Sequence, residues 1–128
     1  MLHGFSRGSA NSYAVAALDA GRDGRHYFSL FVASSGGVAL DFPPTRAIAN
    51  GDYGPRPLQN TRWVTAAGGR DPHPDRDGIE GMRRTAAWLK EQGGTVVLAI
   101  EDAKEGHGAL QRNGNVKKVL DFYFKNAR

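Results

Sequence analysis

The sequence predicts an α/β fold in which a mostly parallel sheet carries helices on both faces. Two observations support this prediction. The runs YFSLFVA (27–33) and TVVLAI (95–100) are nearly continuous in apolar residues, as expected of strands that are buried on both faces. Such runs alternate along the chain with segments of helical periodicity, and this alternation is typical of parallel sheets with helical crossovers.

Length and composition indicate one compact domain over residues 1–128. The chain has 128 residues, 40% of them hydrophobic, and a domain of this size buries roughly two-thirds of its unfolded surface. The absence of cysteine excludes disulfides, thiolate metal sites and cysteine nucleophiles. No apolar run approaches the roughly 18 residues of a membrane span, and the start of the chain lacks a signal-peptide pattern. The compartment is therefore left open, and no membrane partner is expected.

The net charge of +4 comes from scattered basic residues. The only adjacent basic pairs, Arg83-Arg84 and Lys117-Lys118, fall on predicted helices. This distribution is typical of a solvated surface, so no nucleic-acid partner is expected.

In the first half of the chain, a short apolar start at Met1-Leu2 predicts a strand. Residues 7–20 carry small apolar residues at helical spacing, and Gly21 is expected to end that helix. The run 27–33 is the next strand. Residues 36–60 then show no clear period, and their four prolines are expected to prevent a continuous helix or strand. We expect a lid or rim loop there.

The second half has a more regular pattern. RWVTAA (62–67) is expected to be a strand, followed by a polar turn at 71–78. An amphipathic helix is predicted over 78–92, and the strand 95–100 follows it. The apolar stripe of a final helix is formed by Val116, Val119, Leu120 and Tyr123.

The pentapeptide Gly4-Phe5-Ser6-Arg7-Gly8 matches the pattern G-x-S-x-G. This motif places a serine on a tight turn between a strand and a helix, with its hydroxyl exposed. A side chain at Gly4 or Gly8 is expected to collide with the neighbouring strand or helix.

Three polar residues follow predicted strands: Ser6, Asp71 and His107. The carboxyl ends of parallel strands meet at one edge of a sheet, and the order Ser…Asp…His is the one that the G-x-S-x-G motif requires. If folding brings them together, His107 takes the proton of Ser6, Ser6 attacks a carbonyl, and Asp71 stabilises the imidazolium. The backbone N–H of Arg7 would then donate one oxyanion-hole hydrogen bond.

Taken singly, each of these residues has a plain structural explanation. Ser6 could cap a helix, Asp71 could initiate a turn, and His107 could be a surface loop residue. Their joint arrangement favours catalysis.

The carboxylate could also come from Asp75 or Asp77, although Asp71 lies nearest the strand end. A zinc site built from His73, His107 and a carboxylate is conceivable, but no tight ligand spacing supports it. No metal and no cofactor is expected.

Over essentially its whole length, the chain resembles the C-terminal part of an α/β-hydrolase-fold serine hydrolase. The matching stretches are GFSRGSANSYAVAALD, TRWVTAAGGRDP and TVVLAIEDAKEGHGAL. Within the family the chain looks closest to the polyhydroxybutyrate-depolymerase and feruloyl-esterase-like esterases. The resemblance implies that Ser6 is the nucleophile, Asp71 the acid and His107 the base.

The resemblance also implies that the N-terminal strands of a complete sheet, and the loop that supplies a second oxyanion donor, are missing here. The first strand then becomes an exposed edge, which favours self-association.

The leading functional hypothesis is hydrolysis of carboxylic esters, either small molecules or polymers. Tentative substrate contacts in the segment 36–60 are Phe42, Tyr53, Arg56 and Leu58. One alternative is a serine peptidase of the same fold, because the triad alone does not distinguish esters from amides. The other is a non-catalytic fragment that folds only with a partner or by self-association.

Overall fold

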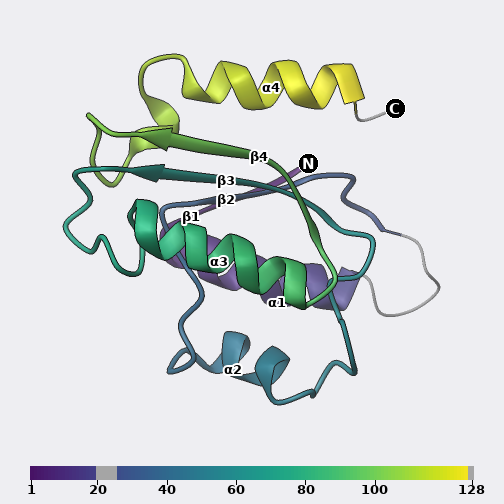
Figure 1. Ribbon diagram of the computed structural model, residues 1–128. Coiled ribbons are helices and arrows are strands. Elements are labelled where there is room, and N and C mark those ends of the chain that lie inside the picture. The colour runs from purple at the N-terminus through teal and green to yellow at the C-terminus, as the bar shows by residue number, and fades with distance from the viewer. Residues whose placement is uncertain (20–25, 127–128) are drawn as a thin grey trace.

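A single four-stranded sheet forms the centre of the molecule (Figure 1). In this computed structural model, which describes residues 1–19 and 26–126, the strands are β1 (Leu2–Phe5), β2 (Phe31–Ser34), β3 (Arg62–Gly68) and β4 (Thr95–Asp102). All three neighbouring pairs are parallel, and the spatial order β1-β2-β3-β4 equals the chain order. The predicted parallel sheet is therefore confirmed.

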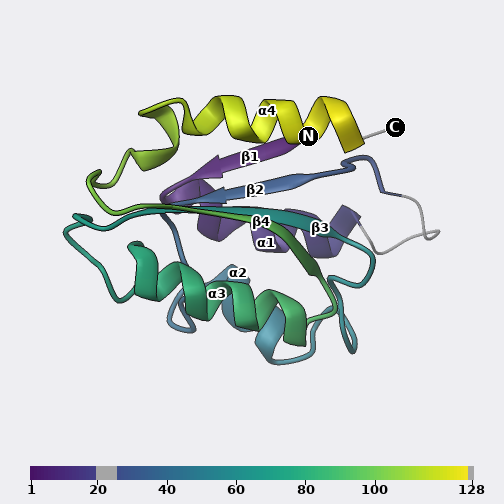
Figure 2. The same ribbon diagram turned by 45° about the horizontal axis from the view of Figure 1, so that its top comes forward.

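Helices cover both faces of this sheet, as predicted (Figure 2). The helices are α1 (Arg7–Asp19), α2 (Pro43–Ala49), α3 (Ile79–Glu91), the short 3-10 helix η1 (Ala109–Gln111) and α4 (Asn115–Asn126). Helix α4 lies on one face, α1 and α3 lie on the other, and α2 packs on the outer side of α1. None of the helices in the described part of the chain is long and apolar enough to cross a membrane.

Each face of the sheet has its own hydrophobic core. Under α1 and α3, the rings of Phe31 and Trp63 stack with centroids 4.8 Å apart, and Tyr13 packs against Trp63 at 5.5 Å. Under α4, the core contains Val32 and Val64, the chain neighbours of Phe31 and Trp63. Alternate residues of a strand point to opposite faces, so two buried faces require the continuous apolar runs seen in the sequence.

One expected loop contains a helix, and one predicted strand starts later than expected. The segment 36–60 contains helix α2, which begins at Pro43 and has proline at its first two positions. Proline fits there because the first N–H groups of a helix need no intrahelical acceptor. The predicted strand 27–33 starts only at Phe31, and the N–H groups of Tyr27 and Phe28 instead donate to the Asp19 carboxylate.

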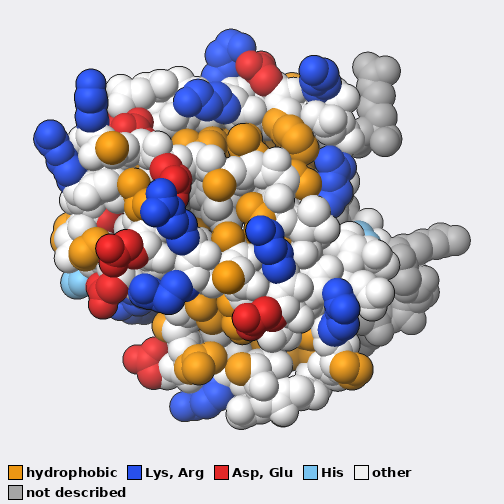
Figure 3. All heavy atoms as spheres, in the orientation of Figure 1, with side chains coloured by type: hydrophobic (Ala, Val, Ile, Leu, Met, Phe, Trp, Pro, Cys, Tyr) orange, Lys and Arg blue, Asp and Glu red, His pale blue; other side chains and the backbone are white. Residues whose placement is uncertain are grey.

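The remaining elements match their predictions to within three residues, apart from the expected stop at Gly21, which lies outside the described residues. On the face drawn in Figure 3, Lys and Arg side chains are interspersed with acidic, apolar and neutral groups, and no continuous basic stripe crosses that face.

Candidate active site

Ser6 occupies the tight turn between β1 and α1. Its φ of 57° lies in the left-handed region, which non-glycine residues rarely adopt. The Ser6 N–H donates to the carbonyl oxygen of Ser34 at 2.9 Å, and the Ser6 carbonyl accepts from the Ala10 N–H at 3.2 Å. The strand β2 and the first turn of α1 therefore hold the strained backbone in place.

The two glycines of the motif differ in their surroundings. A Cβ added to Gly4 would lie 2.4 Å from the carbonyl oxygen of Gly8, a backbone atom that cannot yield. A Cβ on Gly8 would meet no atom of the described residues within 4 Å. The expectation that both positions require glycine is therefore wrong for Gly8, because its Cβ would point away from the turn into open space.

Asp71 lies in the loop after β3, with its side chain fully buried. Its Oδ1 accepts a hydrogen bond of 2.8 Å from the backbone N–H of His73, and its own N–H donates to the Gly68 carbonyl at 3.3 Å. This local turn fixes the carboxylate and leaves Oδ2 for another donor.

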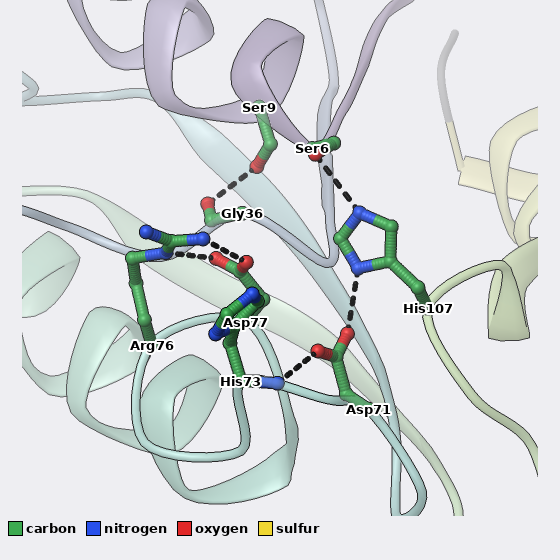
Figure 4. Close-up of polar contacts among 8 residues, drawn as sticks. All are labelled: Ser6, Ser9, Gly36, Asp71, His73, Arg76, Asp77 and His107. Atoms are coloured by element: carbon green, nitrogen blue, oxygen red, sulfur yellow. Dashed lines mark hydrogen bonds and ion pairs between the residues drawn. The ribbon is translucent and has the colours of Figure 1, made fainter.

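His107 lies in the loop after β4 and joins the other two predicted residues (Figure 4). Its Nδ1 is 2.7 Å from Asp71 Oδ2, and its Nε2 is 2.9 Å from Ser6 Oγ. With the ring proton on Nδ1, the imidazole donates a hydrogen bond to Asp71 and accepts one from the Ser6 hydroxyl. The three residues from the ends of β1, β3 and β4 thus form one line of hydrogen bonds.

Close backbone contacts join the loops around these residues. A Cβ on Gly36 would lie 2.0 Å from the Ser6 carbonyl oxygen, and one on Gly68 would lie 2.1 Å from the Gly106 carbonyl oxygen. The Gly36 carbonyl also accepts hydrogen bonds from Ser9 Oγ at 2.7 Å and from the Tyr13 hydroxyl at 2.6 Å. Burial raises the pKa of Tyr13, so this hydroxyl keeps its proton and remains a donor.

A pocket of about 280 Å³ opens beside Ser6. Its wall includes Arg7, Phe42 and the neighbouring pair Arg76 and Asp77. Arg7 is the first residue of α1, so its backbone N–H has no acceptor within the helix and can serve a ligand. Of the predicted substrate contacts, Phe42 lies in this wall.

The other predicted contacts do not line that pocket. Leu58 is fully buried in the core under α1 and α3, where its N–H donates to the Gln92 carbonyl. Tyr53 packs against the same core, and Arg56 is exposed. The assignment of Leu58 was wrong because this apolar side chain is buried and packs the segment against the sheet.

Sequence reasoning missed the role of Arg76 in the pocket wall. Its Nε and Nη2 donate to the two Asp77 carboxylate oxygens at 2.9 and 2.8 Å, and this pairing raises the pKa of Arg76. Asp77, which the sequence offered as an alternative acid or as a cap for the helix at Gly78, has a side chain that is 5% exposed and makes no cap hydrogen bond. Adjacent charges in a polar turn give no sequence signal that separates this arrangement from a solvated loop.

Within residues 1–19 and 26–126, one group of three metal-ligand types comes together. Ligand atoms of Asp71, Asp77 and His107 lie within 4.8 Å of one another. His73 contributes its backbone N–H to Asp71, and its side chain is not part of this group.

No family model matches the chain, and no curated protein matches it by sequence. Among solved structures, it is similar to Zea mays acyl-protein thioesterase 2, with 20% identity and a TM-score of 0.69 over 98% of this chain and 55% of that one. It is also similar to Pyrococcus horikoshii acylaminoacyl peptidase, with 14% identity and a TM-score of 0.64 over 95% of this chain and 23% of that one. The chain has part of the α/β-hydrolase fold.

Proposed function

We propose that this chain carries the catalytic residues of a serine hydrolase that cleaves carboxylic esters through an acyl-enzyme intermediate. The observation that carries the proposal is the line of hydrogen bonds from Ser6 through His107 to the buried Asp71. The left-handed Ser6 at a strand-to-helix turn supports it, because this geometry exposes a nucleophile beside a helix N-terminus.

In the proposed first half-reaction, the Ser6 Oγ attacks the carbonyl carbon while its proton moves to His107 Nε2. The negative charge that forms on the carbonyl oxygen is stabilised by the Arg7 backbone N–H, and the imidazolium is stabilised by Asp71. When the intermediate collapses, the bond to the leaving alcohol breaks and His107 returns the proton to that alcohol.

In the second half-reaction, water hydrolyses the acyl-enzyme through the same steps. His107 removes a proton from the water as it attacks the acyl carbon, and Ser6 leaves with that proton as the free acid departs. Every proton therefore passes through His107 Nε2, the ring nitrogen that lies 2.9 Å from Ser6 Oγ.

Esters are the proposed substrates, in line with the resemblance to the esterase branch, and Phe42 supplies an apolar contact in the pocket. The same acyl-enzyme chemistry extends to thioesters, the bond type named for the maize neighbour. A peptidase activity, as named for the Pyrococcus neighbour, is the second candidate. Comparing kcat/KM for matched ester and amide substrates separates the two.

The direct test is labelling with a fluorophosphonate probe, followed by mass spectrometry of the modified peptide. We expect the label on Ser6, its loss in Ser6→Ala, and unchanged labelling in Ser29→Ala, which removes an exposed serine away from the pocket. Hydrolysis of a p-nitrophenyl ester should follow the same pattern. Wild-type labelling in Ser6→Ala, or no labelling of the wild type, would overturn the proposal.

A further inference from the structure

A second buried carboxylate lies beside the Ser6–His107–Asp71 line. Ligand atoms of Asp77, Asp71 and His107 all lie within 4.8 Å of one another, although only Asp71 is hydrogen-bonded to the imidazole. Since a hydrogen bond needs about 2.8 Å, the Asp77 carboxylate would have to move by no more than roughly 2 Å to bond to the ring. A small movement of the Asp77 side chain would therefore bring it into competition with Asp71 for the imidazole.

Arg76 donates a hydrogen bond to each oxygen of the Asp77 carboxylate. The two parallel hydrogen bonds, 2.9 Å from Nε and 2.8 Å from Nη2, form the fork geometry that orients a carboxylate most firmly. Figure 4 shows the guanidinium on the side of Asp77 that faces away from His107.

The Arg76 backbone is itself enclosed on two sides. A Cβ on Gly37 would lie 2.1 Å from the Arg76 carbonyl oxygen, and one on Gly81 would lie 2.2 Å from the same atom. The Arg76 N–H also donates to the His73 carbonyl at 3.2 Å. The Arg76 backbone is thus held between the loop after β2 and the first turn of α3, and this fixes the position from which its side chain reaches Asp77.

We propose that Arg76 is a positioning residue that, by holding Asp77, leaves Asp71 as the sole carboxylate partner of the His107 imidazole. The inference rests on the proposed function and assigns a further residue to that site. Without Arg76, a buried and unpaired Asp77 carboxylate competes with Asp71 for the imidazole N–H, because ligand atoms of the three residues lie within 4.8 Å of one another. The ring is then drawn away from Ser6, and the 2.9 Å contact that proton transfer needs is lost.

The test is a double-mutant cycle between Arg76 and Asp77. We expect Arg76→Gln to reduce kcat by about 10²-fold, the typical effect of misplacing a reacting group by about 1 Å. Adding Asp77→Asn should recover most of that loss, because the competing carboxylate is gone. A purely structural role for the pair predicts instead that Arg76→Gln lowers the free energy of unfolding while the kcat of the folded protein stays unchanged.

A matched control exists on the surface of the same chain. Arg83 makes the same kind of fork with Glu101, at 2.6 and 2.9 Å, and neither residue lines the pocket. Arg83→Gln should leave kcat unchanged. If Arg76→Gln does not fold, Arg76→Lys replaces it in the test, since a lysine cannot form the fork. The loss of kcat in Arg76→Lys should then also be relieved by Asp77→Asn.

A second readout does not depend on turnover, so it separates failure of this inference from failure of the proposed hydrolase activity. The proton shared by His107 Nδ1 and Asp71 should give a far-downfield NMR resonance in the wild type and in the double variant. We expect it to be shifted or lost in Arg76→Gln. An unchanged resonance in that variant, or a loss of kcat that Asp77→Asn fails to relieve, would overturn the proposal.

Discussion

The two glycines of the G-x-S-x-G pentapeptide should respond to alanine in opposite directions. The Cβ of Gly4→Ala would lie 2.4 Å from the Gly8 carbonyl oxygen, 2.6 Å from the Gly8 carbonyl carbon and 2.7 Å from the Ser9 nitrogen. All three atoms belong to the first turn of α1, so the side chain has no room unless the helix moves away from β1. The Cβ of Gly8→Ala meets open space on an exposed part of α1.

These contacts set the expected free energies of unfolding. Forcing a methyl group into packed backbone costs about 3 kcal/mol, the upper end of ordinary overpacking. Alanine instead of glycine at an unstrained helical position stabilises by roughly 0.5–1 kcal/mol, because the unfolded chain loses freedom. For a domain of this size, each kcal/mol shifts Tm by about 4 °C. Gly4→Ala should therefore lower Tm by about 12 °C, and Gly8→Ala should raise it by about 2–4 °C.

Thermal unfolding followed by circular dichroism measures both shifts, and urea unfolding checks them at constant temperature. Fluorophosphonate labelling of the same variants tests the site, because displacement of α1 in Gly4→Ala also displaces the Arg7 N–H. Destabilisation of Gly8→Ala by 1 kcal/mol or more would refute the reasoning from space around the glycine, as would a Gly4→Ala protein with the wild-type Tm.

Three further predictions follow from the site and the sheet edge. Asp71→Asn should reduce kcat by about 10⁴-fold, whereas Asp75→Asn, on an exposed side chain, should leave ester hydrolysis unchanged; the reverse result would mean that the wrong carboxylate was chosen. His107→Ala should lose activity to a similar degree, so retained activity in His107→Ala contradicts its role as base. Because β1 is an outer strand, the chain should elute as a dimer or larger in size exclusion with light scattering, and His3→Pro, which removes an N–H from that strand, should shift it to the monomer mass.

The sheet was predictable because burial on both faces leaves a direct mark on the sequence. Phe31 and Val32 point into different cores, so neither position tolerates a polar residue, and the run reads as continuously apolar. Helix α2 left no comparable mark. Its seven residues begin with two prolines, and the periodicity of so short a helix cannot outweigh that signal in the sequence.

The expectation that Ser6, Asp71 and His107 lie together rested on the G-x-S-x-G motif, on the order of the three residues along the chain, and on the rule that functional residues gather at the carboxyl ends of parallel strands. The sequence favoured Asp71 over Asp77 as the carboxylate nearest the strand end, and in the structure only Asp71 is hydrogen-bonded to the imidazole, although ligand atoms of both lie within 4.8 Å. What separates them is local: the His73 N–H orients Asp71, and the Arg76 guanidinium engages Asp77. Neither interaction has a sequence pattern that differs from an ordinary polar turn.

Close backbone contacts that only glycine permits fix the relative positions of the loops that carry Ser6, Asp71 and His107. Gly36 lies against the Ser6 carbonyl, Gly37 against the Arg76 carbonyl, and Gly68 against the Gly106 carbonyl. These contacts link the loops after all four strands, so the loop carrying the serine is fastened to the loop after β2, and that loop to the one carrying both carboxylates. A hydrogen bond of 2.9 Å between residues 101 positions apart needs such a frame, because the side chains alone cannot fix the distance between their loops.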